Sequence, residues 1–221
     1  MNRVNLFLSI LLLFVFHIPG KAFSQSKHQT EWVLSQLISS KTEGIRITGH
    51  PRIIDCKYGK ALVFNGSTDG IFLEEMPLSD LKEFTIEVLF YPESGGNFEQ
   101  RFFHCGEVKG DRVLLELRST QTDWYFDAYI KSGDQQKTLI EPELKHPLDQ
   151  WYHIACAVDH RKLSTYINGK KELESSISFE AIKKGETSIG TRLNEQSWFK
   201  GAISQIRISP KALKATDFMT F

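Results

Sequence analysis

Cysteine is scarce in this 221-residue chain, which contains only Cys56, Cys105 and Cys156. An odd number leaves at least one thiol unpaired, so the disulfide framework of a small secreted domain cannot be assumed. Cys105 and Cys156 both lie in strand-like runs and would pair only if those strands were adjacent. We expect instead that they behave as small buried hydrophobic residues.

An excess of charge of one sign is also missing. The chain carries 27 basic and 27 acidic side chains, without a long run of either. This balance disfavours nucleic acid as a partner, because a nucleic-acid-binding surface needs a basic excess. The 7 histidines are not spaced as i, i+2 or i, i+4 pairs, so the sequence does not support a zinc site.

The longest hydrophobic run, residues 6–18, follows the basic start MNRVN. It is shorter than the ~20 residues that span a bilayer. With Ala22 and Ser24 beyond it, it predicts a secretory signal peptide over residues 1–24, with an uncleaved anchor helix as the alternative. We therefore expect a mature protein of residues 25–221 that is secreted to an extracellular or periplasmic space and has no membrane span.

Helical periodicity is limited to 30–40 and 209–218, near the two ends of the expected mature chain. Between them side chains alternate with a period of two, and Gly, Asp, Asn or Pro clusters separate the runs. The expected strands are 84–92, 101–107, 111–119, 124–132, 151–159, 163–167, 187–193 and 202–209. This pattern predicts a single all-β domain, built as an antiparallel sandwich.

The segment STYINGKKE has alternating residues on both sides of Asn168-Gly169. An Asn-Gly pair in this setting is the strongest short-range signal for a two-residue hairpin, because both turn residues need positive φ. We interpret this pair as a turn and not as a binding site.

Four segments in order resemble the laminin-G-like branch of the concanavalin A-like lectin and glucanase superfamily. They are GKALVFNGSTDGIFL, FTIEVLFYPE, WYHIACAVDHRKLSTYINGKKE and SIGTRLNEQSWFKGAISQIRIS. The resemblance implies a jelly-roll sandwich of two antiparallel sheets. Members of the family bind glycans or proteins, and a minority cleave polysaccharides, so the fold alone does not decide the function.

Alternation divides each expected strand into an inward and an outward face. The predicted core contains Ile86, Val88, Phe90, Val113, Leu115, Leu117, Phe126, Ile130, Ile154, Val158 and Ile206. The outward residues mix aromatic rings, carboxylates and guanidinium groups, which are the groups that bind sugars. The predicted ligand-binding set on one open face is Glu116, Arg118, Tyr125, Asp127, Tyr129 and His153, closed at one end by Arg192, Asn194 and Trp198.

From this set we predict a partner that is an extracellular glycan or polysaccharide, bound without catalysis. An ordinary solvated face with cross-strand ion pairs is the alternative for any one of these residues. A protein-binding adhesion module is a further alternative.

An enzyme is a weaker alternative. Sandwich glucanases carry paired carboxylates on one strand, and here Glu172 and Glu174 have that spacing without a third acidic residue or flanking aromatics. The strings LELRS and YIKSGDQQ faintly resemble alginate-lyase motifs, but the intervening Gln-hydrophobic-His motif is missing. A polysaccharide lyase or a glycoside hydrolase therefore stays open as an alternative function.

Calcium is the one cofactor that the resemblance suggests, because relatives often hold it with loop oxygens. Asn65 and Asp69 in FNGSTDG are the predicted ligands, and Asn194 and Glu195 are further oxygen donors. Ser204 and Gln205 stand where many family members have an acidic residue.

Overall fold

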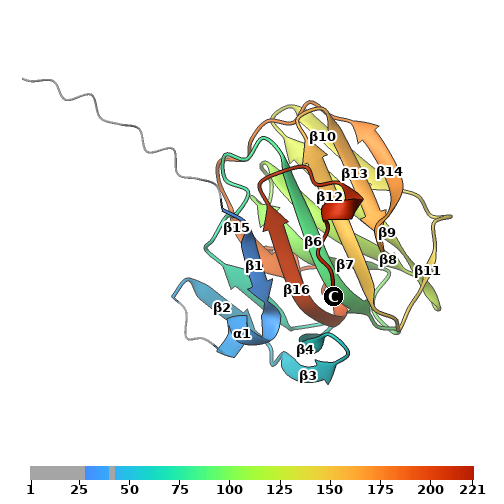
Figure 1. Ribbon diagram of the computed structural model, residues 1–221. Helices are drawn as coiled ribbons and strands as arrows, with labels where there is room; N and C mark the ends of the chain where they lie inside the picture. The colour runs from blue at the N-terminus through green and yellow to red at the C-terminus, as the bar shows by residue number, and fades with distance from the viewer. Residues whose placement is uncertain (1–27, 40–42) are drawn as a thin grey trace, which may run out of the picture.

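A computed structural model describes residues 28–39 and 43–221. Two antiparallel sheets of 8 strands each pack face to face (Figure 1). The predicted signal peptide lies outside the described residues. The antiparallel sandwich predicted from the sequence is confirmed.

One sheet, called sheet A here, contains both the hairpin and the last strand of the chain. In spatial order its strands are β14 (Lys170–Ser176), β13 (Lys162–Ile167), β12 (Tyr152–Asp159), β6 (Phe84–Pro92), β16 (Lys200–Ser209), β4 (Gly59–Asn65) and β3 (Arg52–Cys56), with β1 (Thr30–Val33) also paired to β16. The short helix α1 (Leu34–Ser39) follows β1, and a 3₁₀ turn, η1 (Ala215–Asp217), follows β16.

The second sheet, called sheet B, contains the middle of the chain. Its strands are β10 (Gln135–Ile140), β9 (Asp123–Ser132), β8 (Arg112–Ser119), β7 (Glu99–Gly106), β15 (Glu186–Ile189), β5 (Gly70–Leu73) and β2 (Ile45–Thr48), with β11 (His146–Pro147) paired to β9.

The predicted alternation is confirmed along the central strands. All eleven predicted core residues are buried, and Trp124 and Phe126 face the core as expected. Phe90 of sheet A stacks on Phe102 of sheet B with ring centroids 4.9 Å apart, and it meets Trp124 edge-on at 5.1 Å. Such aromatic pairs contribute beyond the area they bury, so these rings join the two sheets.

The boundaries differ from the sequence prediction where turns interrupt the alternation. The expected strand 187–193 ends at Ile189, because Gly190 has a φ of 82° and a Cβ there would lie 2.2 Å from the Phe64 ring. The short outer strands β2, β3, β10 and β11 were not predicted. Their apolar positions are too few to show a period.

Cys105 and Cys156 are free and buried, as predicted, and they lie in opposite sheets. Burial raises the pKa of each thiol to about 12, so both remain protonated. Among the residues that the structure describes, no helix is long and apolar enough to cross a membrane.

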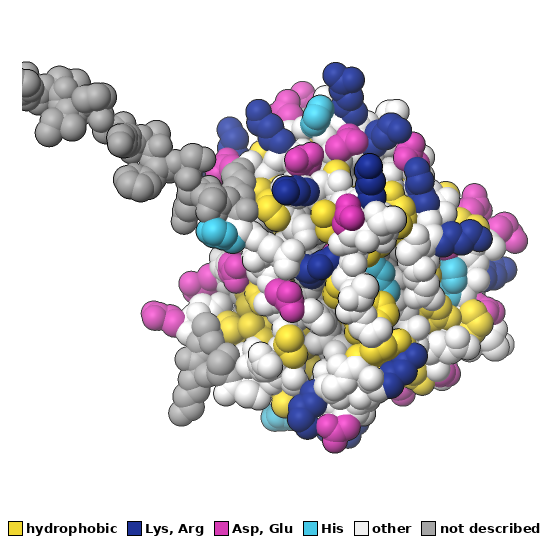
Figure 2. All heavy atoms as spheres, viewed as in Figure 1, with side chains coloured by type: hydrophobic (Ala, Val, Ile, Leu, Met, Phe, Trp, Pro, Cys, Tyr) yellow, Lys and Arg dark blue, Asp and Glu magenta, His cyan; other side chains and the backbone are white. Residues whose placement is uncertain are grey.

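Charged side chains of both signs are interspersed on the outer face of sheet A, and hydrophobic side chains appear there only in small separate patches (Figure 2). This distribution agrees with the balanced charge of the sequence.

The Asn168-Gly169 pair forms the predicted two-residue turn. Ile167 pairs with Lys170, and the φ angles of Asn168 and Gly169 are 49° and 77°. The turn residues are therefore both left-handed, as a type I′ hairpin requires.

We expect Gly169→Val to lower the free energy of unfolding by about 1–3 kcal/mol, because a β-branched residue is strained at positive φ. A Cβ at this position meets no atom within 4 Å, so strain and not collision would cause the loss. Thermal unfolding measures it. Gly169→Asn is the matched control and should stay near the wild type, because Asn tolerates this conformation. Equal losses for the two variants would contradict the strain argument.

Candidate functional site

The candidate site lies on the outer face of sheet B, where β7, β8 and β9 are neighbours. Antiparallel pairing places Arg101 opposite Glu116 and Glu116 opposite Asp127. The next row places Arg118 between Glu99 and Tyr125. A register shift between Arg101 and Phe103 interrupts the alternation of β7.

Two arginines and three carboxylates form one ion network on this face. Arg101 Nε donates to Glu116 Oε1 at 2.8 Å, and its Nη1 contacts Glu99. Arg118 Nη2 donates to Asp127 Oδ2 at 2.5 Å and to Glu116 Oε2 at 3.3 Å. Arg118 Nη1 lies 2.8 Å from Glu99 Oε2, in an ion pair without hydrogen-bond alignment.

The network is buried although it faces away from the core. Glu116 and Asp127 are each only 2% exposed. The open face predicted from alternation is therefore wrong in this respect. Loop 190–199 folds over the sheet: Arg101 N donates to Ser197 O at 2.8 Å, and Leu193 N donates to His104 Nδ1 at 3.2 Å.

Burial affects the protonation of both carboxylates. It raises the pKa of Glu116 to about 7, with Asp127 adding to the rise while Arg101 and Arg118 oppose it. Burial also raises the pKa of Asp127, although Arg118 acts in the opposite direction. Two carboxyl groups side by side repel each other when both are ionised.

A pocket of about 200 Å³ opens beside the network. Its lining residues are Arg101, Arg112, Leu114, Glu116, Arg118, Asp127, Tyr129, Thr138 and Arg192. The Arg112 guanidinium lies 4.8 Å from the centre of the Tyr129 ring, and its Nη2 donates to the Tyr129 hydroxyl at 3.3 Å. The pocket thus combines an aromatic ring with charged groups of both signs.

Besides Arg118 Nη1, which has an ion pair with Glu99, three buried polar atoms of the pocket lining have no hydrogen-bond partner among the described residues: Arg112 Nε, Arg192 Nε and Asp127 Oδ1. An unsatisfied buried polar group costs roughly 1–3 kcal/mol. Because native structures contain few such groups, three at one pocket make this pocket the candidate site.

The structure brings together most of the predicted ligand-binding set. Five of its residues line one pocket and are therefore neighbours, as predicted: Glu116, Arg118, Asp127, Tyr129 and Arg192. Three further members lie elsewhere on this side of the molecule and do not line the pocket.

Tyr125 is on the same face, opposite Arg118, but is buried. Asn194 is exposed and donates to Gln196 at 3.0 Å. Trp198 is half-buried and pairs with Arg101 through the backbone.

His153 does not belong to this site, and its predicted placement is corrected here. It lies on β12 in sheet A, where its Nε2 is 3.1 Å from Glu87 Oε1. Alternation shows which residues of a strand face outward but not to which sheet the strand belongs. His153 lies on the outer face of sheet A and Asp127 on the outer face of sheet B, on opposite sides of the sandwich.

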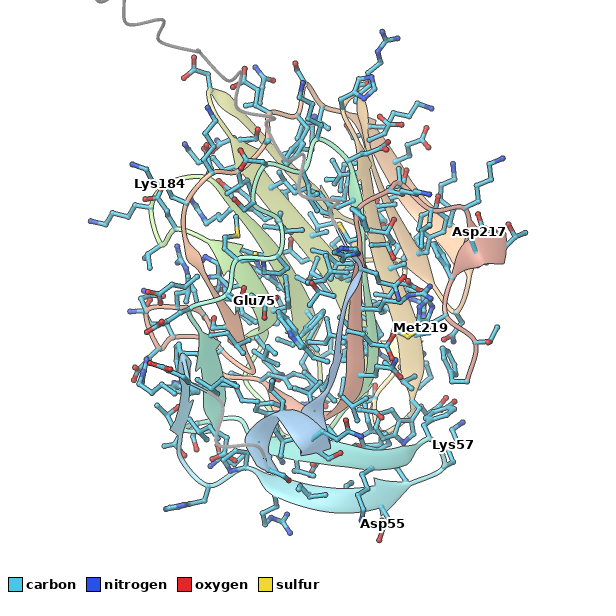
Figure 3. The ribbon with its side chains drawn as sticks, turned by 60° about the vertical axis from the view of Figure 1, so that its left-hand side comes forward. Asp55, Lys57, Glu75, Lys184, Asp217 and Met219 are labelled. Carbon is cyan, nitrogen blue, oxygen red and sulfur yellow. The ribbon has the colours of Figure 1, made fainter. Side chains whose placement is uncertain are left out.

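The C-terminal segment covers His153. Met219 N donates to Glu87 Oε1 at 2.7 Å, and the Phe218 ring lies 5.5 Å from the His153 ring. Figure 3 shows Met219 and Asp217 together on one side of the molecule, with Glu75 and Lys184 toward the other. Burial opposes ionisation of Glu87, but hydrogen bonds from His153, Met219 and Arg207 outweigh it and lower the pKa of Glu87.

The predicted calcium ligands Asn65 and Asp69 serve the turn between β4 and β5. Asp69 Oδ1 accepts from His50 N at 2.8 Å, and its Oδ2 accepts from Asn65 N at 3.0 Å. Asn65 Oδ1 accepts from the backbone nitrogens of Ser67 and Thr68, each at 2.9 Å. These oxygens already bind N–H donors, and the described residues contain no group of three His, Cys, Asp or Glu side chains placed for a metal ion.

Several pocket residues are absent from the sequence prediction. Arg112 and Leu114 share the outward phase of Glu116, so alternation along β8 could have found them. Arg101 could not be found this way, because the register shift in β7 changes its phase. Thr138 comes from β10, a strand that the sequence did not predict.

A family model for the concanavalin A-like lectin/glucanases superfamily matches residues 65–217. The chain belongs to this superfamily. The resemblance seen in the sequence is confirmed, and the two sheets of this concanavalin A-like chain agree with it. A search of curated proteins gives no match.

Solved structures share the fold. Domain 4 of AbnA, a GH43 extracellular arabinanase from Geobacillus stearothermophilus, in complex with arabinotriose, has a TM-score of 0.61 and 24% identity, over 78% of this chain and 84% of that one. A heptameric SAP-like pentraxin from Limulus polyphemus has a TM-score of 0.57 and 17% identity, over 70% and 77%. The receptor-binding domain of botulinum neurotoxin type G has a TM-score of 0.57 and 14% identity, over 78% and 44%.

We expect His104 to make the stability of this concanavalin A-like fold depend on pH. Burial lowers the pKa of His104 to about 3, with Arg192, Arg112 and Arg101 acting in the same direction. The unfolded chain therefore takes up a proton near pH 6.5 that the folded chain resists. The contribution of His104 to the free energy of unfolding is therefore fully present above pH 6.5 and is lost progressively as the pH falls toward 3.

We expect His104→Asn to reduce the acid loss of stability by up to about 1.4 kcal/mol per pH unit below pH 6.5. Asn keeps an acceptor for the backbone N–H of Leu193, which His104 Nδ1 accepts at 3.2 Å. Urea unfolding of both proteins between pH 7 and 4 measures the two slopes. Parallel curves would show that His104 does not carry this dependence.

Proposed function

We propose that the chain binds a glycan in the sheet B pocket without cleaving it. The observation that carries this proposal is the group of unsatisfied polar atoms beside the Tyr129 ring. Guanidinium and carboxylate groups donate to and accept from sugar hydroxyls, and an aromatic ring packs against the C–H groups of a sugar. The pocket supplies all three kinds of group.

The size of the pocket limits what it holds. At about 200 Å³ it is smaller than the roughly 300–1,000 Å³ of pockets that take drug-sized ligands. We propose that it takes a single sugar ring of a longer chain. Affinity for one ring is modest, which suits a module that holds an abundant polymer.

Two further points support a glycan. The AbnA domain was solved in complex with arabinotriose, and a neurotoxin binding domain of the same fold was solved in complex with SialylT. The predicted signal peptide over residues 1–24 would deliver the chain to the compartment where polysaccharides occur. Secretion, extracellular or periplasmic, is part of the proposal.

An enzyme is the second candidate, because Glu116 and Asp127 face each other on the adjacent strands β8 and β9, and burial raises the pKa of Glu116 to about 7. A proton donor beside a second carboxylate is the arrangement of a glycoside hydrolase. Both Glu116 oxygens accept from arginines, however, which occupies the groups that would do the chemistry. A reducing-end assay tests for a hydrolase, and absorbance of unsaturated products tests for a lyase.

We expect Tyr129→Ala to weaken glycan binding about fivefold or more, since an aromatic contact contributes roughly 1 kcal/mol. Tyr129→Phe keeps the ring and should lose much less. Titration calorimetry with a glycan selected on an array measures both affinities.

Lys137→Ala is the control for this test. Lys137 pairs with the core residue Ile130, so it belongs to the opposite phase of β10 from Thr138 and the pocket. The Lys137→Ala variant should bind the glycan with the affinity of the wild type. Equal affinities for Tyr129→Ala and Lys137→Ala would contradict binding at this pocket, and an array that captures no glycan would favour the protein-binding alternative.

A further inference from the structure

The pocket on sheet B is divided into two ends of different charge. At one end, Arg101 and Arg118 are neutralised by three carboxylates. Arg101 lies 2.8 Å from Glu116, and Arg118 lies 2.5–3.3 Å from Asp127, Glu99 and Glu116. At the other end stand the two remaining lining arginines, Arg112 and Arg192.

Arg112 has no carboxylate partner among the described residues. Its Nη1 donates to Gly110 O at 2.6 Å and its Nη2 to the Tyr129 hydroxyl at 3.3 Å. Its Nε is buried without an acceptor. A carbonyl and a phenol orient the guanidinium but leave its positive charge uncompensated.

Arg192 is held in the same way. Its Nη2 donates to Val108 O at 2.8 Å, its Nε is buried without an acceptor, and no carboxylate of the described residues forms an ion pair with it. Burial, with the positive charges of Arg101 and Arg112, lowers the pKa of Arg192, although Glu116 and Glu99 act in the opposite direction. Arg112 and Arg192 are thus two cations of the pocket lining that form no ion pair with a carboxylate of the described residues.

The nearby histidine does not offset this charge. His104 lies on β7 opposite Leu114, two residues from the pair that Gly106 forms with Arg112. Its ring is neutral at physiological pH, because burial lowers its pKa to about 3. Its Nδ1 accepts from Leu193 N, which fixes the start of the loop that carries Arg192.

We propose that the pocket recognises an acidic sugar, with the carboxylate or sulfate of one residue bound between Arg112 and Arg192 and its ring hydroxyls facing Glu116 and Asp127. This inference rests on the proposed function and names the class of glycan. Arginine pairs an oxyanion through two parallel hydrogen bonds, which a hydroxyl cannot match in strength.

The acid end of the pocket argues against a small free anion as the ligand. Glu116 and Asp127 line the same pocket and would repel an anion small enough to reach them. A sugar ring separates its acidic substituent from its neutral hydroxyls, so it satisfies both ends at once. The Tyr129 ring, which Arg112 already contacts, adds an apolar surface that inorganic ions do not need.

The test uses matched pairs of oligosaccharides on an array, followed by titration calorimetry. Uronate oligosaccharides are compared with their methyl esters, and sulfated oligosaccharides with their desulfated forms, so each pair differs only in charge. We expect the acidic member of at least one pair to bind tenfold or more tightly, and its affinity to fall as NaCl rises from 50 to 300 mM. The two kinds of pair distinguish carboxylate from sulfate.

Arg192→Gln and Arg112→Gln should each remove the preference for the acidic member, and Arg192→Lys should restore part of it. Arg52→Gln, which removes an exposed arginine from β3 of sheet A, is the matched control and should keep the preference. Thermal unfolding of each variant confirms that the protein is folded.

The outcomes separate this inference from the proposed function. Equal binding of acidic and neutral members, lost in Tyr129→Ala but kept in Arg192→Gln, would overturn the acidic-sugar inference and leave glycan binding in place. Failure of every member to bind would overturn both.

Discussion

The register between β8 and β9 is the constraint on which the rest of the site depends. Leu115 pairs with Ala128 and Leu117 with Phe126 on the core side, which forces Glu116 opposite Asp127 on the outer side. A shift by one residue would move every apolar side chain of the strand to the wrong face. Two opposed carboxylates are unfavourable, so the core can keep this register only with cations beside them, and Arg101 and Arg118 supply these.

Both outer faces of the sandwich are covered by chain that follows the strands. Loop 190–199 lies over sheet B and joins Ser197 to Arg101. The C-terminal segment lies over sheet A, where Met219 binds Glu87. The polar residues beneath these segments are therefore partly desolvated, and their ionisation depends on a few neighbours rather than on bulk water. This explains why Glu87 and Glu116, both on outer faces, have pKa values shifted in opposite directions.

The sequence predicted features that depend on local alternation and missed those that depend on how distant strands meet. The phase of Trp124 and Phe126 follows from their own strand, and the type I′ turn follows from Asn168-Gly169 alone. His153 has an equally clear phase, yet it lies in the other sheet, because strand order in space is not written in a single strand. Arg101 is hidden by a register shift, and Arg192, which lines the pocket together with Glu116, comes from a loop far along the chain.

The C-terminal segment has a practical consequence for any assay of this protein. Phe218 is buried over sheet A, while Phe221 is 56% exposed on the same side. The candidate pocket lies on the outer face of sheet B, on the other side of the core. A chain attached to a solid support through Phe221 would therefore be oriented with its pocket turned away from that support. The pocket would then be accessible even to a polymer that is too large to enter the space between the protein and the support.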